Sequence, residues 1–427
     1  MKTHPLPIPL SNTARRPPAA PPGSRGSVLL RLPLILILSA CIRRPATAQE
    51  WLKTTAPDSA WTSVACSSDG VKLVAVARGP VDPDLHTVYT SADSGATWTQ
   101  TTAPSAGWTS VTSSADGNRL VIAADDFPGG LVYHSKDAGA TWEKADFPGS
   151  FWTSLASSVS GDTLLLSSAN YPDGPVYRSG DAGLTWQRTG LPPSAWTSVT
   201  ISANGLKCLA VSNSFPESRA YFSHDGGITW KPTGLPFSAW TSVASSADGS
   251  RVIAVSNAYP DGPVYISSDG ALTWARSSAP SDNYTAVASS ADGLRLLAAA
   301  ALINGQRGTI YASLDGGGSW APTVSPALEW TGLASSADGR LQVAVAKGEG
   351  IYLRRTASPR ITGFSRLGDG GFQLNCAGAA DDRLSVQAST DLRTWAEIGT
   401  AAQLTPGVFQ FIDGEAPRIQ TRFYLVK

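Results

Sequence analysis

The stretch Ser223-His224-Asp225-Gly226-Gly227-Ile228-Thr229-Trp230 recurs, with small changes, six times in a chain of 427 residues. The shared pattern is S-x-D-x-G-x-T-W, and the copies cover residues 91–98, 135–142, 179–186, 223–230, 267–274 and 313–320. Ala271 replaces the Gly in the fifth copy, and Ser319 replaces the Thr in the sixth. The closing tryptophans lie 44, 44, 44, 44 and 46 residues apart, which is the length of a four-stranded propeller blade. The repeat therefore predicts the fold.

Each copy resembles the Asp-box, or BNR repeat, of sialidases, sortilin-type receptors and photosystem II assembly-factor propellers. The resemblance implies a β-propeller in which the Ser and Asp side chains clasp a turn, the Gly takes a positive φ and the Trp packs beneath. Six equivalent copies without a clustered second carboxylate favour this structural role over catalysis or calcium binding. The structural aspartates are Asp93, Asp137, Asp181, Asp225, Asp269 and Asp315.

A second repeat places an aromatic residue ten positions after every box Trp. With the pair Trp51 and Trp61, it defines seven units, which begin at Trp61, Trp108, Trp152, Trp196, Trp240, Tyr284 and Trp330. No box precedes Trp51, and none follows Tyr352. We therefore predict that an outer strand near residues 50–55 pairs with the last unit, 330–355, and closes the ring.

The predicted fold class is all-β, because apolar residues alternate and no long segment keeps a helical period. We expect a seven-bladed β-propeller over residues 49–357 with closure by the N-terminal strand. In the second unit the expected strands cover residues 108–111, 120–123 and 131–135, and an outer strand starts at Trp142. A small β-sandwich-like domain is expected over 358–427, with strands near 372–375, 384–388, 408–411 and 422–426.

Residues 1–48 differ in composition from the rest, because basic residues precede a short apolar run over 32–42. This pattern is typical of an export signal and is too short for a membrane span. Two processing sites compete: Ala46-Thr47-Ala48 precedes Gln49, and Leu38-Ser39-Ala40-Cys41 resembles a bacterial lipobox whose Cys41 would carry lipid. Both place the protein outside the cytoplasm, either secreted or lipid-anchored.

The formal charge of zero includes seven basic residues before Gln49, so the remaining chain has 26 basic and 33 acidic residues and a charge of −7. With no basic stripe, nucleic acid is not an expected partner. No two cysteines suggest a disulfide, because Cys66 falls in the first unit, Cys208 in the fourth and Cys376 in the C-terminal segment. We interpret all three as small buried residues. His86, His134 and His224 fall in different units, so we predict no metal site and no cofactor.

The Asp-boxes and D-G hairpins should share one face, here called the Asp-box face, and the loops after the second and outer strands should form the opposite loop face. Four consecutive units carry an aromatic-proline pair in the loop after the second strand. The candidate ligand-binding residues there are Phe127, Tyr171, Phe215 and Tyr259 with Asp126, Asp173, Glu217 and Asp261. Aromatic rings beside carboxylates suit stacking on a sugar or a peptide. The alternative, which the pattern favours, is a rigid loop that packs its own aromatic ring inward.

The ring of unit-starting aromatic residues is interpreted as wedges between blades rather than as a binding ring. A sialidase would also need an arginine triad, a nucleophilic Tyr with a Glu partner and an acid Asp. The family's Arg-Ile-Pro motif is absent from the first strand after Gln49, and the loop-face arginines are Arg78, Arg219 and Arg307. We therefore expect a monomeric, non-catalytic module that binds an unknown glycan or protein, with a sialidase-like glycosidase as the alternative. The assembly-factor likeness is weakened because we find no arginine-rich patch.

Overall fold

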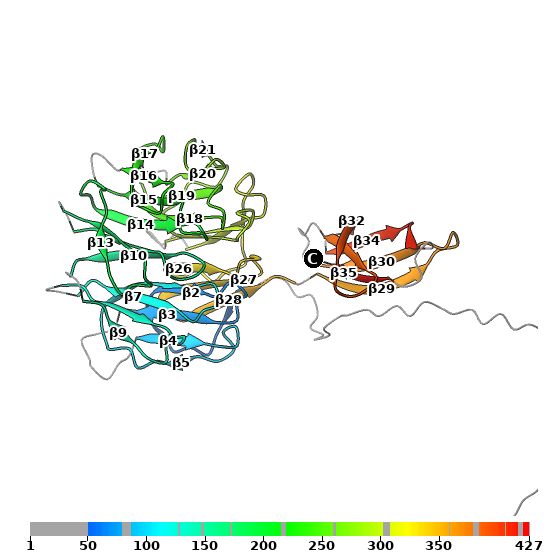
Figure 1. The fold of residues 1–427 in the computed structure, drawn as a ribbon, viewed down its shortest axis with the longest axis horizontal. Coiled ribbons are helices and arrows are strands. Elements are labelled where there is room, and N and C mark those ends of the chain that lie inside the picture. The colour runs from blue at the N-terminus through cyan, green and yellow to red at the C-terminus, as the bar shows by residue number, and fades with distance from the viewer. Residues whose placement is uncertain are drawn as a thin grey trace, which may run out of the picture.

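The computed structural model describes residues 50–78, 87–126, 129–146, 149–170, 173–214, 219–258, 262–301, 308–357, 359–378, 384–405, 407–416 and 422–426. Every regular element in these ranges is a β-strand, so the all-β prediction is confirmed. No helix of the described part is long and apolar enough to cross a membrane. Figure 1 shows a large stack of sheets joined by a linker to a smaller C-terminal body.

Antiparallel sheets repeat along the chain in units of four strands. The inner strands are β2 (Ser59–Cys66), β6 (Trp108–Ser113), β10 (Trp152–Ser157), β14 (Trp196–Ile201), β18 (Trp240–Ser245), β22 (Tyr284–Ser289) and β26 (Trp330–Ser335). The second strands are β3 (Leu73–Ala77), β7 (Leu120–Ala124), β11 (Leu164–Ser168), β15 (Cys208–Ser212), β19 (Val252–Ser256), β23 (Leu296–Ala300) and β27 (Leu341–Glu349). The units are numbered 1 to 7 in chain order by their inner and second strands, so unit 1 contains β2 and β3 and unit 7 contains β26 and β27.

The third strands end at the boxes, and the outer strands follow them. The third strands are β4 (Val88–Ser91), β8 (Val132–Ser135), β12 (Val176–Ser179), β16 (Ala220–Ser223), β20 (Val264–Ser267), β24 (Ile310–Ser313) and β28 (Ile351–Arg355). The outer strands are β5 (Thr99–Gln100), β9 (Glu143–Lys144), β13 (Gln187–Arg188), β17 (Lys231–Pro232), β21 (Ala275–Arg276), β25 (Ala321–Pro322) and, for unit 7, β1 (Leu52–Lys53).

The aromatic residue at the start of each repeat unit lies on the inner strand and is fully buried between neighbouring units. Trp108 has no exposed surface and packs with Val74 and Val88 of unit 1 and with Ile122 of its own unit. Each of these rings also meets a tyrosine of its own third strand edge to face, with centroids 5.3 to 6.1 Å apart. The wedge interpretation is therefore confirmed, and these rings cannot stack on a ligand.

A bulge after each of these aromatic residues turns a threonine toward the next unit. In unit 2 the register shifts between Trp108 and Ser110, and the Thr109 hydroxyl donates to the backbone oxygen of Trp152 at 2.8 Å. Among the described residues, seven equivalent bonds of 2.7 to 2.8 Å form a closed cycle, because Thr331 of the last unit donates to Trp61 of the first. The cycle ties neighbouring inner strands together.

The first and last strands of the repeat region meet in one sheet, as the sequence predicted. Strand β1 pairs antiparallel with β28, with Leu52 opposite Leu353. Trp51 is 5% exposed, its indole nitrogen donates to the Thr323 hydroxyl at 3.0 Å, and its ring lies 6.3 Å from that of Trp330. A further pairing joins β27 to β2 of unit 1, which makes the two units one eight-stranded sheet.

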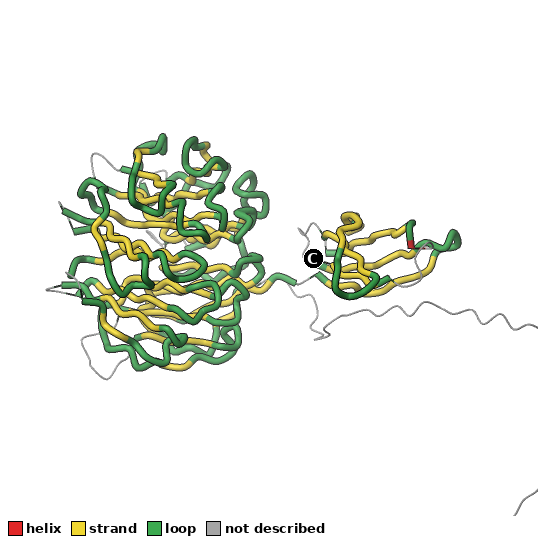
Figure 2. The backbone as a smooth tube through the Cα atoms, viewed as in Figure 1, coloured by secondary structure: helices red, strands yellow, loops and turns green. Residues whose placement is uncertain are grey.

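The C-terminal segment has its own core. One sheet has the order β29-β30-β34-β33 and the other β32-β31-β35, visible at the right of Figures 1 and 2. The bounds are β29 (Arg360–Arg366), β30 (Phe372–Ala377), β31 (Ser385–Ser389), β32 (Ala396–Thr400), β33 (Ala402–Thr405), β34 (Val408–Asp413) and β35 (Phe423–Val426). Leu374, Val386 and Phe409 are buried between the sheets. The four predicted strands are present, and β29, β32 and β33 were missed.

Candidate functional site

Each Asp-box is a closed network of hydrogen bonds within one turn. In unit 4 the Ser223 hydroxyl donates to Asp225 Oδ1 at 2.7 Å and accepts from Gly227 N at 2.9 Å. Thr229 donates to the same carboxylate through both its backbone N–H and its hydroxyl. The Thr229 hydroxyl is the largest of several hydrogen-bond contributions that lower the pKa of Asp225 to about 2. The other five boxes repeat these bonds, so their carboxylates hold turns together.

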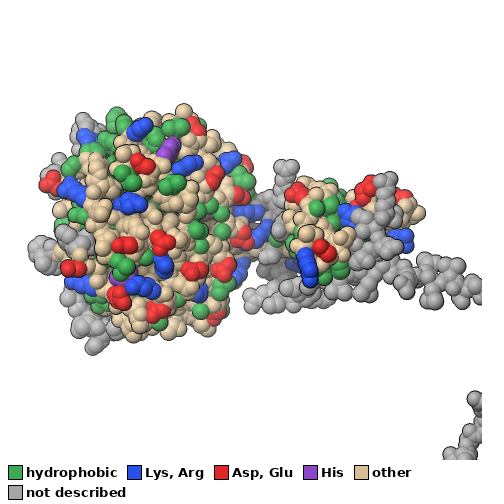
Figure 3. Space-filling view, viewed as in Figure 1, with side chains coloured by type: hydrophobic (Ala, Val, Ile, Leu, Met, Phe, Trp, Pro, Cys, Tyr) green, Lys and Arg blue, Asp and Glu red, His purple; other side chains and the backbone are tan. Residues whose placement is uncertain are grey.

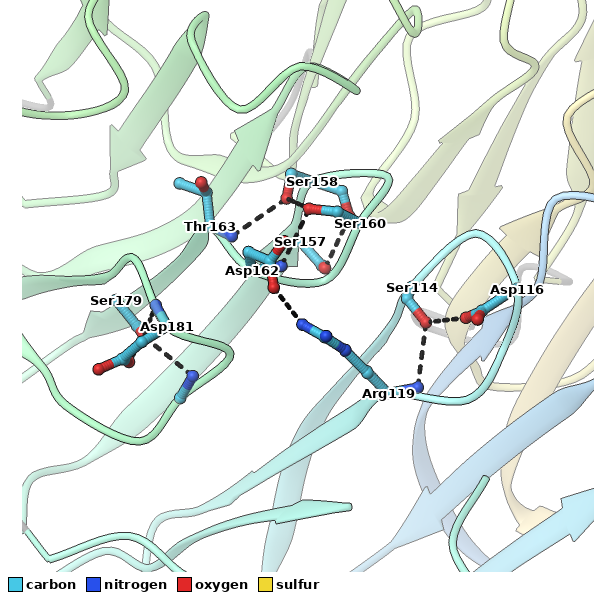
Figure 4. A network of polar contacts seen from close by, with 11 residues as sticks. Ser114, Asp116, Arg119, Ser157, Ser158, Ser160, Asp162, Thr163, Ser179 and Asp181 are labelled. Atoms are coloured by element: carbon cyan, nitrogen blue, oxygen red, sulfur yellow. Dashed lines mark hydrogen bonds and ion pairs between the residues drawn. The ribbon is translucent and has the colours of Figure 1, made fainter. Parts of the chain in front are cut away.

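The D-G hairpins between inner and second strands carry a similar clasp, and they lie against the boxes as expected. In unit 2, Ser114 donates to Asp116 at 2.6 Å, and the box residue Ala138 donates its N–H to the Asn118 backbone oxygen at 2.8 Å. Figure 4 shows Arg119 reaching from this hairpin to Asp162 of unit 3, beside the Ser179 and Asp181 clasp. The Asp-box face is therefore a structural face that fastens adjacent units.

Six of the eight candidate ligand-binding residues lie outside the described residues: Phe127, Tyr171, Phe215, Glu217, Tyr259 and Asp261. The other two have different environments. Both carboxylate oxygens of Asp126 lie 3.0 Å from Gly107 N, so this side chain holds the adjoining loop. Asp173 is exposed on the loop face. Cys41 and Arg307 also lie outside the described residues, while Arg78 forms an ion pair with Asp125.

Glycines fix two of the candidate loops against the next unit. A Cβ atom at Gly174 would lie 2.1 Å from the Ser194 oxygen, and one at Gly262 would lie 2.0 Å from the Asp282 oxygen. Both glycines accept a backbone hydrogen bond from those same residues. Only glycine permits such an approach of two backbones. The ends of the Tyr171 and Tyr259 loops are thus held in place by the fold.

Two exposed aromatic residues on the loop face were missed by the sequence reasoning. Phe237 is 76% exposed and Phe151 is 46% exposed, and each lies in the loop between an outer strand and the next inner strand. The Ala169 N–H donates to the Phe151 oxygen at 3.1 Å, directly before the loop that contains Tyr171. The signal was available, because the other units have a small or polar residue or a proline at each of these two positions.

The loop before unit 6 departs from the repeat. Tyr284 stands where the other units have Trp, and its hydroxyl donates to the Pro280 oxygen. The Tyr311 hydroxyl donates to Asp282 Oδ2 at 3.2 Å, which places a phenol and a carboxylate together on the loop face. Burial is the main cause that raises the pKa of Tyr311, so its hydroxyl stays protonated at neutral pH.

Two of the three cysteines match their predicted role as small buried residues: Cys208 and Cys376 are buried, whereas Cys66 is partly exposed. Cys66, Cys208 and Cys376 are free thiols, and burial raises the pKa of Cys66 and of Cys208 to about 12. Within the described ranges, no group of three His, Cys, Asp or Glu residues could hold a metal ion.

Both ends of the repeat region lie at the Asp-box face. Arg355, the last residue of β28, donates to the Ser94 backbone oxygen in the first box, and Arg340 donates to the Ala357 oxygen at 2.5 Å. Because β1 is antiparallel to β28, residue 50 enters at that same end of the sheet. The loop face carries neither end of the described repeat region.

Comparison with known proteins agrees with this architecture. The BNR/Asp-box repeat model matches residues 221–232. The GH74 xyloglucanase from Xanthomonas campestris is similar in structure, with a TM-score of 0.54 and 18% identity over 77% of this chain. The chain spans only 59% of the length of that xyloglucanase. A search of curated proteins finds no match.

Two further solved structures are similar over nearly their whole length. Hydrazine synthase from Kuenenia stuttgartiensis gives a TM-score of 0.57 at 14% identity, over 72% of this chain and 97% of that one. YCF48, solved with D1 peptide bound, gives 0.52 at 17% identity, over 74% and 99%. The fold and the repeat together define a class, the β-propellers. This chain has that fold and carries a match to the BNR/Asp-box repeat.

Proposed function

We propose that the chain is an exported, non-catalytic seven-bladed propeller whose loop face binds a glycan or a protein segment. The observation that carries the proposal is Phe237, the most exposed large hydrophobic side chain of the described residues, on the face that holds neither end of the described repeat region. An exposed aromatic ring beside polar loops is suited to stacking on a sugar ring or an apolar peptide side chain.

Two hydrogen-bond cycles support the proposal of seven blades. Besides the threonine cycle, seven backbone bonds of 2.7 to 2.9 Å among the described residues run around the D-G hairpins and return from Ala337 to Ser68. Each unit contributes once to each cycle, which supports one blade per unit. We further propose domain limits of 49–357 and 358–427, with residues 1–48 as the export signal and Cys41 as the lipid site if the lipobox is used.

The binding residues are proposed to be Phe151 and Phe237 with Asp173 and the loops that contain Phe127, Tyr171, Phe215 and Tyr259. YCF48 was solved with a peptide bound, which supports a peptide as one ligand class for this fold. On the side of the propeller seen in Figure 3, acidic and basic side chains are interspersed, so this side presents no block of one charge. We propose that the chain acts as a monomer.

The test is a screen of glycans and of extracytoplasmic proteins, followed by alanine variants against the strongest binder. Phe237→Ala, and separately Tyr171→Ala with Tyr259→Ala, should each weaken binding about fivefold per lost stacking contact, because each contact contributes about 1 kcal/mol. The melting temperature should stay nearly unchanged. Phe364→Ala, an exposed phenylalanine of the C-terminal segment, is the matched control. Binding that survives all of these changes would exclude the loop face.

The alternative is a sialidase-like glycosidase, and one observation favours it. Tyr311 and Asp282 bring a phenol and a carboxylate together on the loop face, as a tyrosine nucleophile would require. The raised pKa of Tyr311 weakens it as a nucleophile. A fluorogenic sialoside and a polysaccharide panel decide between the two: turnover that is abolished by Asp282→Asn would replace the binding proposal with the enzyme.

A further inference from the structure

Seven pairs of described residues form a ring around the inner-strand ends on the loop face. In each pair, a backbone N–H at the end of the second strand donates to the backbone oxygen of the residue before the unit-starting aromatic residue, at 2.7 to 3.3 Å. The acceptors are Ala60, Gly107, Phe151, Ala195, Ala239, Asn283 and Glu329, and the respective donors are Arg78, Asp125, Ala169, Asn213, Asn257, Ala301 and Lys347. We call these pairs the loop-face ring. Because its backbone groups are already paired with each other, the ring recognises a ligand mainly through its side chains.

Charge is confined to one side of the loop-face ring. In unit 7 the Lys347 ammonium forms an ion pair of 3.1 Å with Glu329, and between units 1 and 2 Arg78 forms an ion pair with Asp125. These charges neutralise each other within the ring. Units 3 to 6 contribute only uncharged residues, and we call the six from units 3 to 5 the neutral arc: Phe151, Ala169, Ala195, Asn213, Ala239 and Asn257. In the described loops that enter and cross units 3 to 5, the charged residues adjoin outer or third strands instead; they are Asp146, Asp173 and Arg219.

The neutral arc offers both aromatic and amide side chains to solvent. Phe151 is 46% exposed, and Phe237, two residues before Ala239, is 76% exposed. Asn213 and Asn257 are exposed, and their side-chain amides form no hydrogen bond to other described residues. An amide carries both a donor and an acceptor. The arc therefore presents stacking surfaces at units 3 and 5, and neutral hydrogen-bonding groups at units 4 and 5.

We propose that the neutral arc, together with Phe237, binds an uncharged glycan chain; this inference rests on the loop-face binding proposed above and names its ligand class. Sugar hydroxyls donate and accept, as amides do, and the apolar face of a sugar ring stacks on phenylalanine. A sialoside or an acidic peptide requires a basic side chain as its partner, and the arc contains none. Strand β14 lies between β10 and β18, the strands that follow Phe151 and Phe237, so a ligand that covers both rings is a chain of sugars.

A binding screen on the full exported chain tests this proposal, with an array of uncharged and acidic glycans beside a library of displayed peptides. We expect the strongest binder to be an uncharged glycan. Its affinity, measured by calorimetry, should change less than about twofold between about 50 mM and 500 mM salt, because binding forms no ion pair. The affinity should also rise with the number of sugar residues until the ligand covers both Phe151 and Phe237.

Alanine variants of the arc locate the site. Phe151→Ala, Asn213→Ala and Asn257→Ala should each weaken binding about fivefold, because each removes one stacking contact or one hydrogen bond. Gln187→Ala removes an exposed amide on the outer strand β13, and Lys347→Ala removes a charge of the ring in unit 7. Both of these control variants should bind as the parent does. Circular dichroism verifies that each variant is folded.

The outcomes that overturn this inference differ from those that overturn loop-face binding. A peptide or an acidic glycan as the strongest binder, weakened by the three alanine variants of the arc, would contradict the uncharged ligand and leave loop-face binding in place. An uncharged glycan whose affinity is unchanged in all three variants would show that the arc is not its site. A screen without any binder, or a binder insensitive to every loop-face variant, would overturn the proposed function as well.

Discussion

The Thr331 hydroxyl donates a hydrogen bond of 2.7 Å to the backbone oxygen of Trp61, 270 positions earlier in the chain. It closes a cycle that six other threonines continue within the described residues. Since Thr331 sits on a bulge, its side chain reaches both the next strand of its own unit, at Val345, and the first unit of the chain. The last and first inner strands are thereby held in register.

Thr331→Val should lower the free energy of unfolding by about 1 kcal/mol, because valine keeps the shape of threonine but removes the donor to Trp61. Urea unfolding at neutral pH measures the change. Thr331→Ser keeps the hydroxyl and serves as the control. If the serine variant loses more stability than the valine variant, the methyl group matters and the hydrogen bond does not.

Deletion of residues 50–55 should cause aggregation or a large fall in melting temperature. It removes β1, leaves β28 with an unpaired edge, and removes Trp51, whose burial contributes roughly 2–3 kcal/mol. Removal of residues 361–427 should be much milder, because closure uses none of them. Thermal unfolding of both truncated chains provides the comparison, and the reverse order of effects would contradict closure by the N-terminal strand.

The Asp-boxes should make stability fall in acid. Hydrogen bonds lower the pKa of Asp225 and Asp269 from 3.8 to about 2 in the folded chain. Because the folded pKa is depressed, their contribution is present above about pH 4 and is lost as the pH falls toward 2. Asp225→Asn should be less stable than the parent at pH 7, and the two melting curves should converge near pH 2. Asp173→Asn, in an exposed loop, should be as stable as the parent at pH 7. A gap between Asp225→Asn and the parent that stays constant from pH 7 to pH 2 would show that the charge of Asp225 is unimportant.

The fifth box tolerates an alanine in a backbone conformation that favours glycine. Ala271 has φ +73° and Gly227, its equivalent in unit 4, has φ +85°. Gly227→Ala should lower the free energy of unfolding by about 1 kcal/mol or more, since its Cβ would also lie 3.2 Å from Leu165. Ala271→Gly should have the opposite sign and a smaller size, because glycine gains freedom in the unfolded chain. Chemical denaturation of both variants measures the sign of each change in the free energy of unfolding. Equal losses of stability in the two variants would mean that backbone strain does not determine which residue is tolerated here.

The sequence was most informative where one residue type has one structural use. The Ser, Asp and Gly of the box, the buried wedge tryptophans and the pairing of β1 with β28 were all foreseen, because each follows from a turn geometry or from a defect in the repeat. The threonine cycle was not foreseen. A hydroxyl in a strand has several available acceptors, and only the bulge determines which one it meets.

The loop face shows the limit of sequence reasoning more clearly. Asp126 was expected to face a ligand, but its carboxylate binds Gly107 N, a contact that depends on how two loops approach each other. Phe237 was overlooked, although its exposure makes it the more direct candidate. Whether a loop side chain packs inward or outward is decided by the neighbouring unit, which periodicity alone does not describe.

The pairing of Leu52 with Leu353 also means that the start of the propeller chain is an arbitrary cut in a closed circle. The strand order around the circle would be unchanged if the natural ends were joined and new ends were opened in any D-G hairpin. Only the strand that closes the circle would change, from β1 of unit 7 to a strand of the newly opened unit. The natural cut is distinguished by its position: residues 50 and 357 both lie at the Asp-box face, so the two ends of the described repeat region open onto one face.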